Sequence, residues 1–595
     1  MKEEFSHLNK TNYNKIITAH IEKNNVKNGC EIEKMNKSST LNLEELKKGN
    51  TNSKLNTNNK LNENNLKIQP IKMRVNKNGM ISIKPSNGLI SKFLAGKKGS
   101  SYLCKNNEWI FSADNYEELI KILKKEKYSY EKIPKGIIEI VKKQIKNHPF
   151  ELTGGIFDRL LNFQKLAVEF ALNRGGRVLL ADDMGLGKTV QALAVANYYC
   201  VEFPMLIVAP ASLLHAWREA VETFLNEEAT IIREQIDFGA RISVISYNLA
   251  STFSEVIRDR KYNVIICDEC HYLKSKKTKR TQQLLPVLQK SSRLIMISGT
   301  PALSRPLELY ATLCALKCNL FSSFMEYGVR YCNGRKVRNY YDFKGSSNSE
   351  ELLFIMEKEF MIKRSKEQVL GDLPLKTRKQ IILECKKDQC TETRGGLFGN
   401  KVDQDIMQLY TEAVEKKKGA VLKYIEEMVK KGKKFLVYAH HQSMLDGIEE
   451  HLKATGIQYI RMDGKVASAK RHVLVEEFQT KEEIKIAVLS LTACSTGLTL
   501  TAGKAVVFAE LYWNPGTLMQ AEDRVHRIGQ SENVEIHYLV GKNTIDEVVW
   551  PLLSKKLSVL EKLGLSKNDY KKMVGVEQNQ RTINEFFDKA ENYKQ

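Results

Sequence analysis

Short apolar runs alternate with amphipathic stretches along most of the chain, and they form two series. The first predicts strands at Arg177–Ala181, Met205–Ala209, Ile242–Ser246, Val264–Cys267 and Leu294–Ser298. The second predicts strands at Phe435–Tyr438, Tyr459–Met462, Ile486–Ser490 and Ala505–Phe508. Continuous apolar strands separated by helical patterns indicate parallel sheets with helices on both faces. We therefore expect an α/β protein with tandem lobes at 151–320 and 401–551.

The segments that flank the lobes have different patterns. Residues 1–69 are rich in Asn, Lys, Ser and Glu, so they cannot bury enough apolar surface to offset chain entropy, and we expect a disordered tail. Residues 321–400 are interpreted as a helical insertion and connector. Residues 552–595 are interpreted as a charged, partly helical tail.

A small α+β module is predicted at residues 70–130, between the disordered tail and the first lobe. Its alternating runs and one helical pattern are Met80–Ile83, Tyr102–Cys104, Trp109–Phe111 and Tyr116–Lys124. Order is expected to begin near Ile71, and a linker is expected at Lys132–Lys135.

Composition narrows the class of partner. Hydrophobic residues make up 42% and charged residues 27%, and 93 Lys and Arg against 70 Asp and Glu give a formal charge of +23. Such an excess favours nucleic acid as a partner, although a merely solvated lysine-rich surface has the same composition. No apolar run approaches the roughly 20 residues that cross a bilayer, and no signal peptide is evident. We expect a soluble intracellular protein without a membrane partner.

The eleven cysteines are scattered, and only Cys267 and Cys270 form a C-x-x-C pair. Because a structural zinc site needs further ligands at a regular spacing, a zinc finger is not predicted. The pattern fits a reducing compartment.

A glycine-containing loop follows the first strand. Arg177–Ala181 leads into Asp182–Thr189 and then into a helical stretch, Val190–Ala196, the arrangement that cradles phosphates on backbone N–H groups. Lys188 is expected to reach the β- and γ-phosphates of ATP, and Thr189 to hold Mg²⁺. The remaining ATP-binding positions of the loop are Asp183, Met184, Gly185, Leu186 and Gly187. Asp182 replaces the usual first glycine, and a chance Gly-Lys-Thr turn is the alternative.

An acid pair follows another buried strand. Asp268 and Glu269 come directly after Val264–Cys267, at the edge where parallel strands place their catalytic groups. Asp268 is assigned to Mg²⁺, and Glu269 to the attacking water. A pair of acids that cap a helix is the alternative.

The second lobe offers Gln520, Arg524 and Arg527 on successive turns of one helical face. Arginines presented across a cleft stabilise the charge that builds on a γ-phosphate, so Arg524 and Arg527 are predicted to be catalytic and Gln520 to bind ATP. Surface salt bridges are the alternative.

These segments resemble helicase superfamily two and, within it, the Snf-type DNA translocases, from Asp158 to Pro551. Further matching segments are Phe163–Lys165, Ala209–Leu214, Ser246–Asn248, Ser298–Pro301, Asp463–Gly464, Ser495–Ala502 and Trp513–Pro515. The resemblance implies two RecA-like lobes with ATP between them and DNA across both. It implies that Gln164 reads adenine and that Trp513 contacts DNA. It also implies that Ser298, Gly299 and Thr300 couple the ATP state to lobe closure.

A branch of this family is indicated by Ser304–Tyr310, Tyr331–Cys332 and Gly345–Asn348, which look like the annealing-helicase (HepA-related, HARP) proteins. Tyr102 and Trp109–Phe111 resemble the W-x-F core of the HARP module, which is thought to engage branched DNA. The lysines expected to meet phosphate there are Lys97, Lys98 and Lys105. Trp109 and Phe111 are expected in the core rather than stacked on bases.

Two further segments suggest partners. Gln580, Ile583, Phe586 and Phe587 have the form Q-x-x-I-x-x-F-F, which resembles the box that binds the sliding clamp PCNA; a tail helix packed on the motor is the alternative. The basic run Lys274–Arg280 is interpreted as a solvated or DNA-facing loop rather than a nuclear signal. No motif for the single-strand-binding protein RPA is evident, so recruitment by RPA is left open, and no nuclease cluster is found.

The sequence thus predicts a nuclear, ATP- and Mg²⁺-dependent DNA translocase that rewinds or reverses replication forks. The alternative is a Snf-type remodeller of chromatin or of other protein–DNA complexes, although no histone-binding appendage is visible. A clamp-associated scaffold without turnover is disfavoured because Lys188, Asp268, Glu269, Arg524 and Arg527 are intact. An RNA-unwinding enzyme is disfavoured by the form of the second-lobe motifs.

Overall fold

The computed structural model describes residues 70–145, 147–302, 304–321, 323–369, 374–385, 402–494, 500–527 and 529–565, without the side chains of Lys105, 402–407 and 468–469. The predicted tail 1–69, the clamp-binding residues Gln580, Ile583, Phe586 and Phe587, and the segment 495–499 lie outside this part. No helix within it is both long and apolar enough to cross a bilayer.

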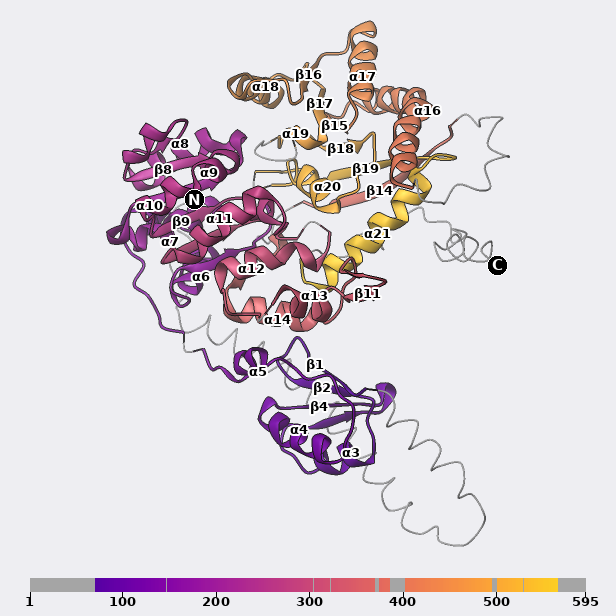
Figure 1. Ribbon diagram of the computed structural model, residues 1–595. Coiled ribbons are helices and arrows are strands. Elements are labelled where there is room, and N and C mark those ends of the chain that lie inside the picture. Colours follow the sequence, from indigo (N-terminus) through magenta and orange to yellow (C-terminus); the bar gives the residue numbers. More distant parts are fainter. Residues whose placement is uncertain are drawn as a thin grey trace, which may run out of the picture. The chain divides into compact units, whose positions relative to one another are not determined.

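The N-terminal module is an antiparallel sheet with helices on its apolar face, in the order β1-β2-β4-β3 (Figure 1). Its elements are β1 Lys72–Val75, β2 Ile81–Lys84, α3 Gly88–Leu94, β3 Ser101–Leu103, β4 Glu108–Phe111 and α4 Tyr116–Lys125. Trp109 and Phe111 are buried, and the indole N–H of Trp109 donates to Ser91 Oγ at 3.0 Å. The prediction that both rings belong to the core is confirmed.

The module is joined to the motor by buried contacts. The backbone N–H of Val75 donates to Glu351 Oε2 at 3.0 Å, and a Cβ atom at Gly79 would lie 2.7 Å from Cζ of Phe354. A linker is predicted at Lys132–Lys135, but this segment is packed against the module. Ile133 is buried, and its backbone N–H donates to the Tyr116 hydroxyl at 2.8 Å. α5 (Lys135–Lys142) follows at once.

Lobe 1 is a parallel sheet in the order β13-β5-β10-β9-β6-β8-β7. Its strands are β5 Arg177–Leu180, β6 Met205–Ala209, β7 Thr230–Ile231, β8 Ile242–Ser246, β9 Val264–Cys267, β10 Arg293–Ile297 and β13 Met361–Ile362. Successive residues of a strand enter opposite cores: Val178 and Leu180 join one apolar cluster, and Leu179 joins the other. The sheet is therefore covered on both faces, as continuous apolar strands require.

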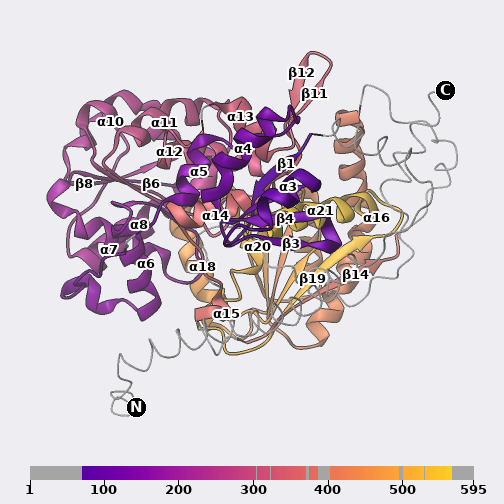
Figure 2. The same ribbon diagram turned by 90° about the horizontal axis from the view of Figure 1, so that it is seen from below.

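The helices of lobe 1 divide between these two faces. One apolar cluster contains side chains of α6 Asn162–Leu172, α7 Lys188–Tyr198 and α8 Leu214–Leu225. The other contains side chains of α9 Tyr247–Thr252, α10 Ser254–Arg260, α11 Lys279–Lys290 and α12 Tyr310–Leu316. Figure 2 shows the sheet between the two layers.

The segment between the lobes differs from the helical insertion expected at 321–400. It contains α13 Phe324–Tyr331, β11 Arg335–Val337, β12 Tyr340–Asp342, α14 Ser349–Glu359, α15 Lys366–Val369 and β14 Lys376–Leu383. β13 pairs with β5 of lobe 1, and β14 pairs with β19 of lobe 2. The expected boundaries at 320 and 401 are therefore wrong, because a two-residue strand and a strand rich in Lys and Arg carry no clear apolar signal.

Lobe 2 is a parallel sheet in the order β14-β19-β18-β15-β17-β16. Its further strands are β15 Phe435–Ala439, β16 Tyr459–Met462, β17 Ile486–Ser490, β18 Ala505–Phe508 and β19 Val534–Gly541. Its helices are α16 Val402–Lys430, α17 Gln442–Ala454, α18 Ser468–Thr480, α19 Leu491–Cys494, α20 Pro515–Glu522 and α21 Asp546–Lys562. Two tandem RecA-like lobes after an α+β module confirm the predicted fold class.

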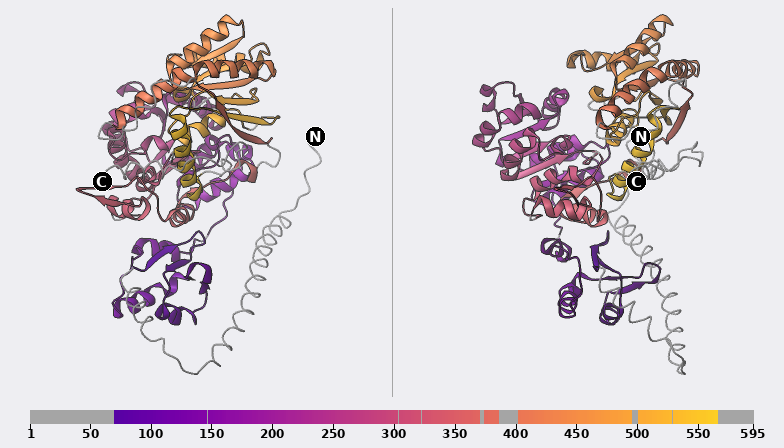
Figure 3. Two further views of the ribbon diagram at one scale, coloured as in Figure 1. Left: turned by 90° about the vertical axis from the view of Figure 1, so that its right-hand side faces the viewer. Right: turned by 45° about the vertical axis from the view of Figure 1, so that its right-hand side comes forward.

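Helix α21 (Asp546–Lys562) bridges the lobes. The predicted start of the tail at residue 552 is therefore too early. Trp550 and Leu553 lie in the core of lobe 2, whereas Leu560, Leu563 and Leu565 lie in the cluster that lobe 1 shares with the N-terminal module. Lys363 Nζ donates to the carbonyl oxygen of Leu565 at 3.3 Å. Figures 1 and 3 show α21 running from the second sheet toward α12 and α13.

Replacing Glu351 with alanine is expected to loosen the module. Glu351 is fully buried, accepts from Arg330 Nε and Nη2 at 2.6 Å each, and holds Val75. Removing one partner of a buried ion pair costs about 3–5 kcal/mol. Urea unfolding and hydrogen exchange in β1 and β2 measure the loss. The exposed neighbour, in Glu350→Ala, is expected to change the free energy of unfolding by less than about 1 kcal/mol, and equal effects of both changes would contradict this role of Glu351.

Candidate ATP site between the two lobes

The loop after β5 has the backbone geometry of a phosphate cradle. Gly185 and Gly187 have φ of +89° and +72°, the left-handed region that favours glycine. A Cβ atom at Gly187 would lie 2.5 Å from Nε2 of Gln164, so a side chain there would collide with α6. Because α7 begins at Lys188, its N-terminal N–H groups and dipole face the loop.

Lys188 is half-buried inside this loop. Its Nζ donates to the carbonyl oxygens of Asp182 and Asp183 at 2.7 and 3.0 Å. Burial lowers the pKa of its ammonium group to about 8, although Glu269 and neighbouring acids oppose the shift. An anionic phosphate beside Nζ would restore the charged form.

Asp182, which stands where a first glycine was expected, anchors the loop. Its carboxylate is fully buried and accepts from the backbone N–H of Arg364 at 2.9 Å and from Gln191 Nε2 at 3.2 Å. The guanidinium group of Arg364 forms an ion pair with it. Arg364 follows β13, so the segment that comes directly after this strand holds the phosphate loop in place through Asp182.

Asp268 and Glu269 lie at the carboxyl end of β9. The indole N–H of Trp217 donates to Asp268 Oδ2 at 2.8 Å, and the backbone N–H of Glu269 donates to Oδ1 at 2.8 Å. Burial and the charge of Glu269 raise the pKa of Asp268 to about 6. Burial also acts to raise the pKa of Glu269, but the hydrogen bond and charge of His271, together with Lys188, lower it overall. The two carboxyl groups therefore have distinct electrostatic environments.

Glu269 is connected to the segment predicted to couple ATP state to lobe closure. Ser298 Oγ donates to Glu269 Oε2 at 3.3 Å, and His271 Nδ1 lies 3.2 Å from the same oxygen. The next residue lies against the loop, since a Cβ atom at Gly299 would be 2.6 Å from Cγ of Met184 and 3.5 Å from Lys188 Nζ. Ser298 thus connects the acid pair to Thr300, whose backbone N–H donates to Ser298 Oγ at 3.2 Å.

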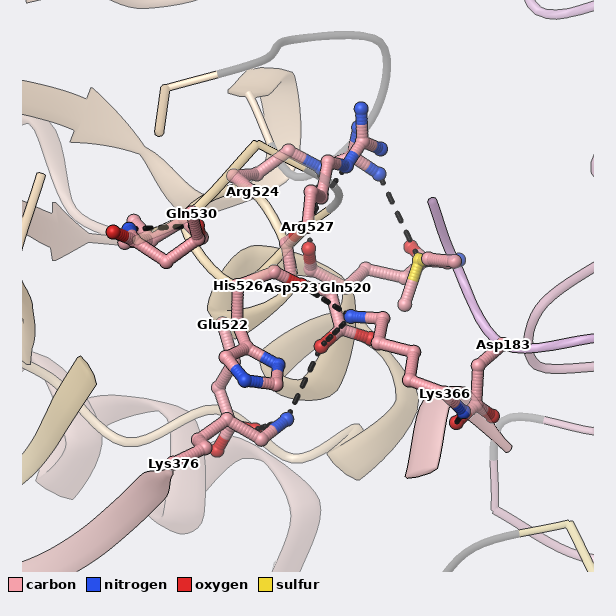
Figure 4. Close-up of polar contacts among 12 residues, drawn as sticks. Asp183, Lys366, Lys376, Gln520, Glu522, Asp523, Arg524, His526, Arg527 and Gln530 are labelled. Carbon is pink, nitrogen blue, oxygen red and sulfur yellow. Dashed lines mark hydrogen bonds and ion pairs between the residues drawn. The ribbon is translucent and has the colours of Figure 1, made fainter. Parts of the chain in front are cut away.

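A cleft between the lobes is lined by residues of both lobes, including Met184 and Thr300. Beside it, lobe 2 contacts lobe 1 through the three side chains predicted for lobe 2 (Figure 4). Gln520 Nε2 donates to Thr300 Oγ1 at 3.1 Å, and Arg524 Nη2 donates to Met184 Sδ at 3.7 Å. A Cβ atom at Gly185 would lie 3.2 Å from Cγ of Arg527. Burial and the like charge of Arg524 lower the pKa of Arg527 to about 9, which favours an anion beside these guanidinium groups.

Lys366 links the phosphate loop of lobe 1 to the arginine-bearing segment of lobe 2, and we call this set of contacts the latch. Its backbone N–H donates to Asp183 Oδ2 at 3.1 Å, and its Nζ donates to Asp523 Oδ1 at 3.1 Å and to the carbonyl oxygen of His526. Burial acts to raise the pKa of Asp523, but the charges of Lys366 and Lys376 lower it far below its usual range. One buried lysine therefore holds the phosphate loop and the arginine-bearing segment together.

The predicted DNA-binding residues lie outside this cleft. Lys97 Nζ pairs with Glu118 Oε2 at 2.8 Å, and Lys98 is exposed, whereas the Lys105 side chain is outside the described part. The half-buried ring of Trp513 packs on Tyr410 at a centroid distance of 4.7 Å. DNA contact by these residues stays a prediction. Adenine recognition by Gln164 also stays a prediction. Its Nε2 donates to the carbonyl oxygen of Leu186, and its Oε1 accepts from the backbone N–H of Leu161.

Sequence reasoning missed Trp217, Arg364 and Lys366. The basic run Lys363–Lys366 could have indicated Arg364 and Lys366. Buried cations need acidic partners, and the phosphate loop and the second lobe both offer acids. Nothing in the sequence connected Trp217 with Asp268.

The fold and this cleft define a two-lobed nucleotide-binding motor core of the helicase type. Residues 163–431 match the SNF2-related domain, and residues 416–529 match the helicase conserved C-terminal domain. The chain is 35% identical over 531 residues to the "SWI/SNF-related matrix-associated actin-dependent regulator of chromatin subfamily A-like protein 1 homolog" of Caenorhabditis elegans, covering 84% of this chain and 77% of the relative. The chain belongs to the SNF2-related family, in the group of these subfamily A-like proteins.

Two other relatives define the extent of the match. The chain is 38% identical over 501 residues to the Xenopus tropicalis "SWI/SNF-related matrix-associated actin-dependent regulator of chromatin subfamily A-like protein 1", covering 79% of this chain and 53% of the relative. It is 40% identical over 433 residues to "DNA annealing helicase and endonuclease ZRANB3" of Bos taurus, covering 67% of this chain and 40% of the relative. The chain thus spans about half the length of the Xenopus relatives.

Replacing Lys366 with methionine is expected to lower the turnover number for ATP hydrolysis about 10-fold or more. The lobes would be less well aligned, and a rise of about 1.4 kcal/mol in the activation free energy has that effect. Steady-state ATPase assays measure it. Lys379→Met is the matched control, since this lysine of β14 forms an ion pair with Glu535 on a more exposed surface. Turnover unchanged in Lys366→Met would contradict the latch.

Proposed function

We propose that this protein is a DNA-dependent ATPase that translocates on duplex or branched DNA and rewinds or reverses replication forks. The observation that carries the proposal is the contact of Arg527 with Gly185: the arginine-bearing segment of one lobe closes directly on the phosphate loop of the other. A triphosphate bound there would lie between cationic groups from both lobes, so its hydrolysis can be linked to lobe movement.

The residues of the cleft fit ATP and Mg²⁺. The left-handed glycines, the α7 N-terminus and Lys188 suit the phosphates, and the hydroxyl of Thr189 with the carboxylate of Asp268 supplies oxygen ligands of the kind Mg²⁺ prefers. Bound Mg²⁺ would neutralise charge on the phosphate oxygens.

Each remaining residue of the site has a defined task in the proposed reaction. Glu269, oriented by His271 and Ser298, would accept a proton from the attacking water. Arg524 and Arg527 would stabilise the charge on the γ-phosphate as it transfers. The bond between Gln520 and Thr300 would transmit the presence or loss of that phosphate to lobe 2.

DNA is the substrate that the charge and the relatives favour. The formal charge of +23 attracts a polyanion, and the bovine relative is named a DNA annealing helicase. Lys97, Lys98, Lys105 and Trp513 remain the proposed DNA contacts, and the N-terminal module the proposed HARP-like reader of branches. A nuclear location accompanies this function. The Xenopus and nematode relatives are named as regulators of chromatin, which favours remodelling of protein–DNA complexes as the second candidate.

Replacing Lys188 or Arg527 with alanine is expected to abolish most ATP hydrolysis. Loss of one preorganised electrostatic group costs about 10²–10³ in turnover, and loss of an arginine finger about 10³ or more. ATPase activity with saturating duplex DNA measures both. Lys453→Ala, an exposed lysine paired with Glu449 on α17, is expected to leave turnover unchanged. Normal turnover in Lys188→Ala would contradict the site.

The nature of the DNA separates the two candidate functions. ATPase activity of the unaltered chain is compared on linear duplex, single-stranded, forked and nucleosomal DNA at one salt concentration. Strongest stimulation by forks supports fork remodelling, and preference for nucleosomes supports the second candidate.

Sliding-clamp binding is proposed separately, on the pattern of Gln580, Ile583, Phe586 and Phe587. Phe586→Ala with Phe587→Ala is expected to abolish binding to PCNA in calorimetry, because clustered aromatic anchors supply most of such an affinity, while ATPase activity is retained. Thr582→Ala with Asn584→Ala, at the variable positions of the box, is the matched control. Clamp binding that survives loss of both Phe rings would contradict the proposal.

A further inference from the structure

The hairpin of β11 and β12 carries a basic and aromatic surface that the ATP cleft does not use. Between Asn333 and Asn348 the sequence has four cations, Arg335, Lys336, Arg338 and Lys344, and a single acid, Asp342. Both strands are almost entirely exposed, and Figure 2 shows them projecting beyond the neighbouring helices. A two-stranded hairpin without a larger sheet is only marginally stable by itself, so its root must be held by other contacts.

The root is held by one aromatic side chain. Cβ atoms at Gly328 and Gly334 would lie 2.5 and 2.7 Å from Cε1 of Phe343, so its ring fills the space that two glycines leave open. Phe324 packs on the same ring edge to face, with centroids 5.4 Å apart. The backbone N–H of Gly334 donates to the carbonyl of Gly328 at 3.0 Å, which fixes the start of β11 on α13. The hairpin is therefore preorganised.

Two exposed tyrosines lie between this anchored ring and the turn, one on each face of the hairpin. Tyr341 stacks on Phe343 with an interplanar angle of 11°, and it remains 41% exposed. Tyr340, next to the turn, is 63% exposed. The register pairs Lys336 with Tyr341 and Val337 with Tyr340. Because successive residues of a strand point to opposite faces, Tyr341 shares one face of the hairpin with Lys336 and Phe343, and Tyr340 shares the other face with Val337.

Exposed rings with cations beside them match the chemistry of unpaired DNA. Bases stack on aromatic rings without sequence preference, and neighbouring phosphates bind Lys and Arg. A regular duplex hides its base faces, whereas a branch point exposes them. Protein interfaces are also enriched in Tyr and Arg, but four cations against one acid on so short a hairpin favour a polyanion over a protein partner.

We propose that the β11–β12 hairpin is a second DNA-binding element, in which Tyr340 and Tyr341 stack on bases exposed at a branch point. Arg335, Lys336 and Arg338 hold the adjoining phosphates. This inference rests on the proposed function and names where the motor meets the branched part of its substrate.

Tyr340→Leu with Tyr341→Leu tests the stacking. Loss of base–aromatic stacking is expected to weaken binding to forked DNA about 5- to 150-fold, and binding to linear duplex less than about twofold. Fluorescence anisotropy with the full chain measures both affinities, and 2-aminopurine at the junction reports the stacked base directly. Tyr340→Phe with Tyr341→Phe keeps the rings and is expected to bind normally. Tyr198→Leu, a 44% exposed tyrosine of lobe 1, is the control.

Arg335→Gln with Arg338→Gln tests the phosphate contacts. The slope of log affinity against log salt for forked DNA is expected to fall by about 1.4–1.8, since each of the two neutralised phosphates contributes about 0.7–0.9. Lys453→Gln with Lys481→Gln removes two exposed cations of lobe 2 as the control.

Two results would overturn the inference: fork affinity of the Leu double variant within twofold of the unaltered chain, or an equal loss for fork and duplex. Failure of the proposed function is distinguishable from either result. Hairpin variants are expected to retain ATP hydrolysis on linear duplex, whereas an error in the site assignment would appear as normal turnover in Lys188→Ala.

Discussion

Buried charge along the seam between the lobes is the constraint on which the rest of the structure depends. A charged side chain removed from water is tolerated only when an opposite charge and hydrogen bonds satisfy it. Asp182 meets Arg364, Lys366 meets Asp523, and Glu522 meets Arg378 at 2.6 Å. The first pair lies within lobe 1 and the third within lobe 2. The pair of Lys366 and Asp523 joins the segment after β13 to lobe 2, so satisfying its charges also fixes the position of one lobe against the other.

The same desolvation prepares the cleft for an anion. The pKa values of Lys188 and Arg527 are lowered chiefly by burial, so both cations are held at an electrostatic cost. A triphosphate would relieve that cost and would do so in both lobes at once. In the proposed function, ligand binding and lobe closure would therefore be thermodynamically linked, as a motor requires.

Within the part of the chain that the structure describes, the elements outside the cleft are attached to this framework by packing. Glu351 holds the N-terminal module through the backbone of Val75. Helix α21 begins in the core of lobe 2 and ends in the cluster around lobe 1. Phe343 roots the projecting hairpin on α13. A step of the lobes can consequently move the surfaces proposed to meet DNA.

The sequence by itself determined the two sheets and the groups of the cleft. Strands such as Met205–Ala209 are buried on both faces, so their apolar runs are continuous, and the loop around Lys188 needs glycines at fixed spacing. Only the tertiary structure decided that β13 and β14 complete the sheets, that α21 extends past 552, and that Arg364, Lys366 and Trp217 support the site. The reason is physical: apolar periodicity is a local signal, whereas the partner of a buried charge is chosen by proximity in space.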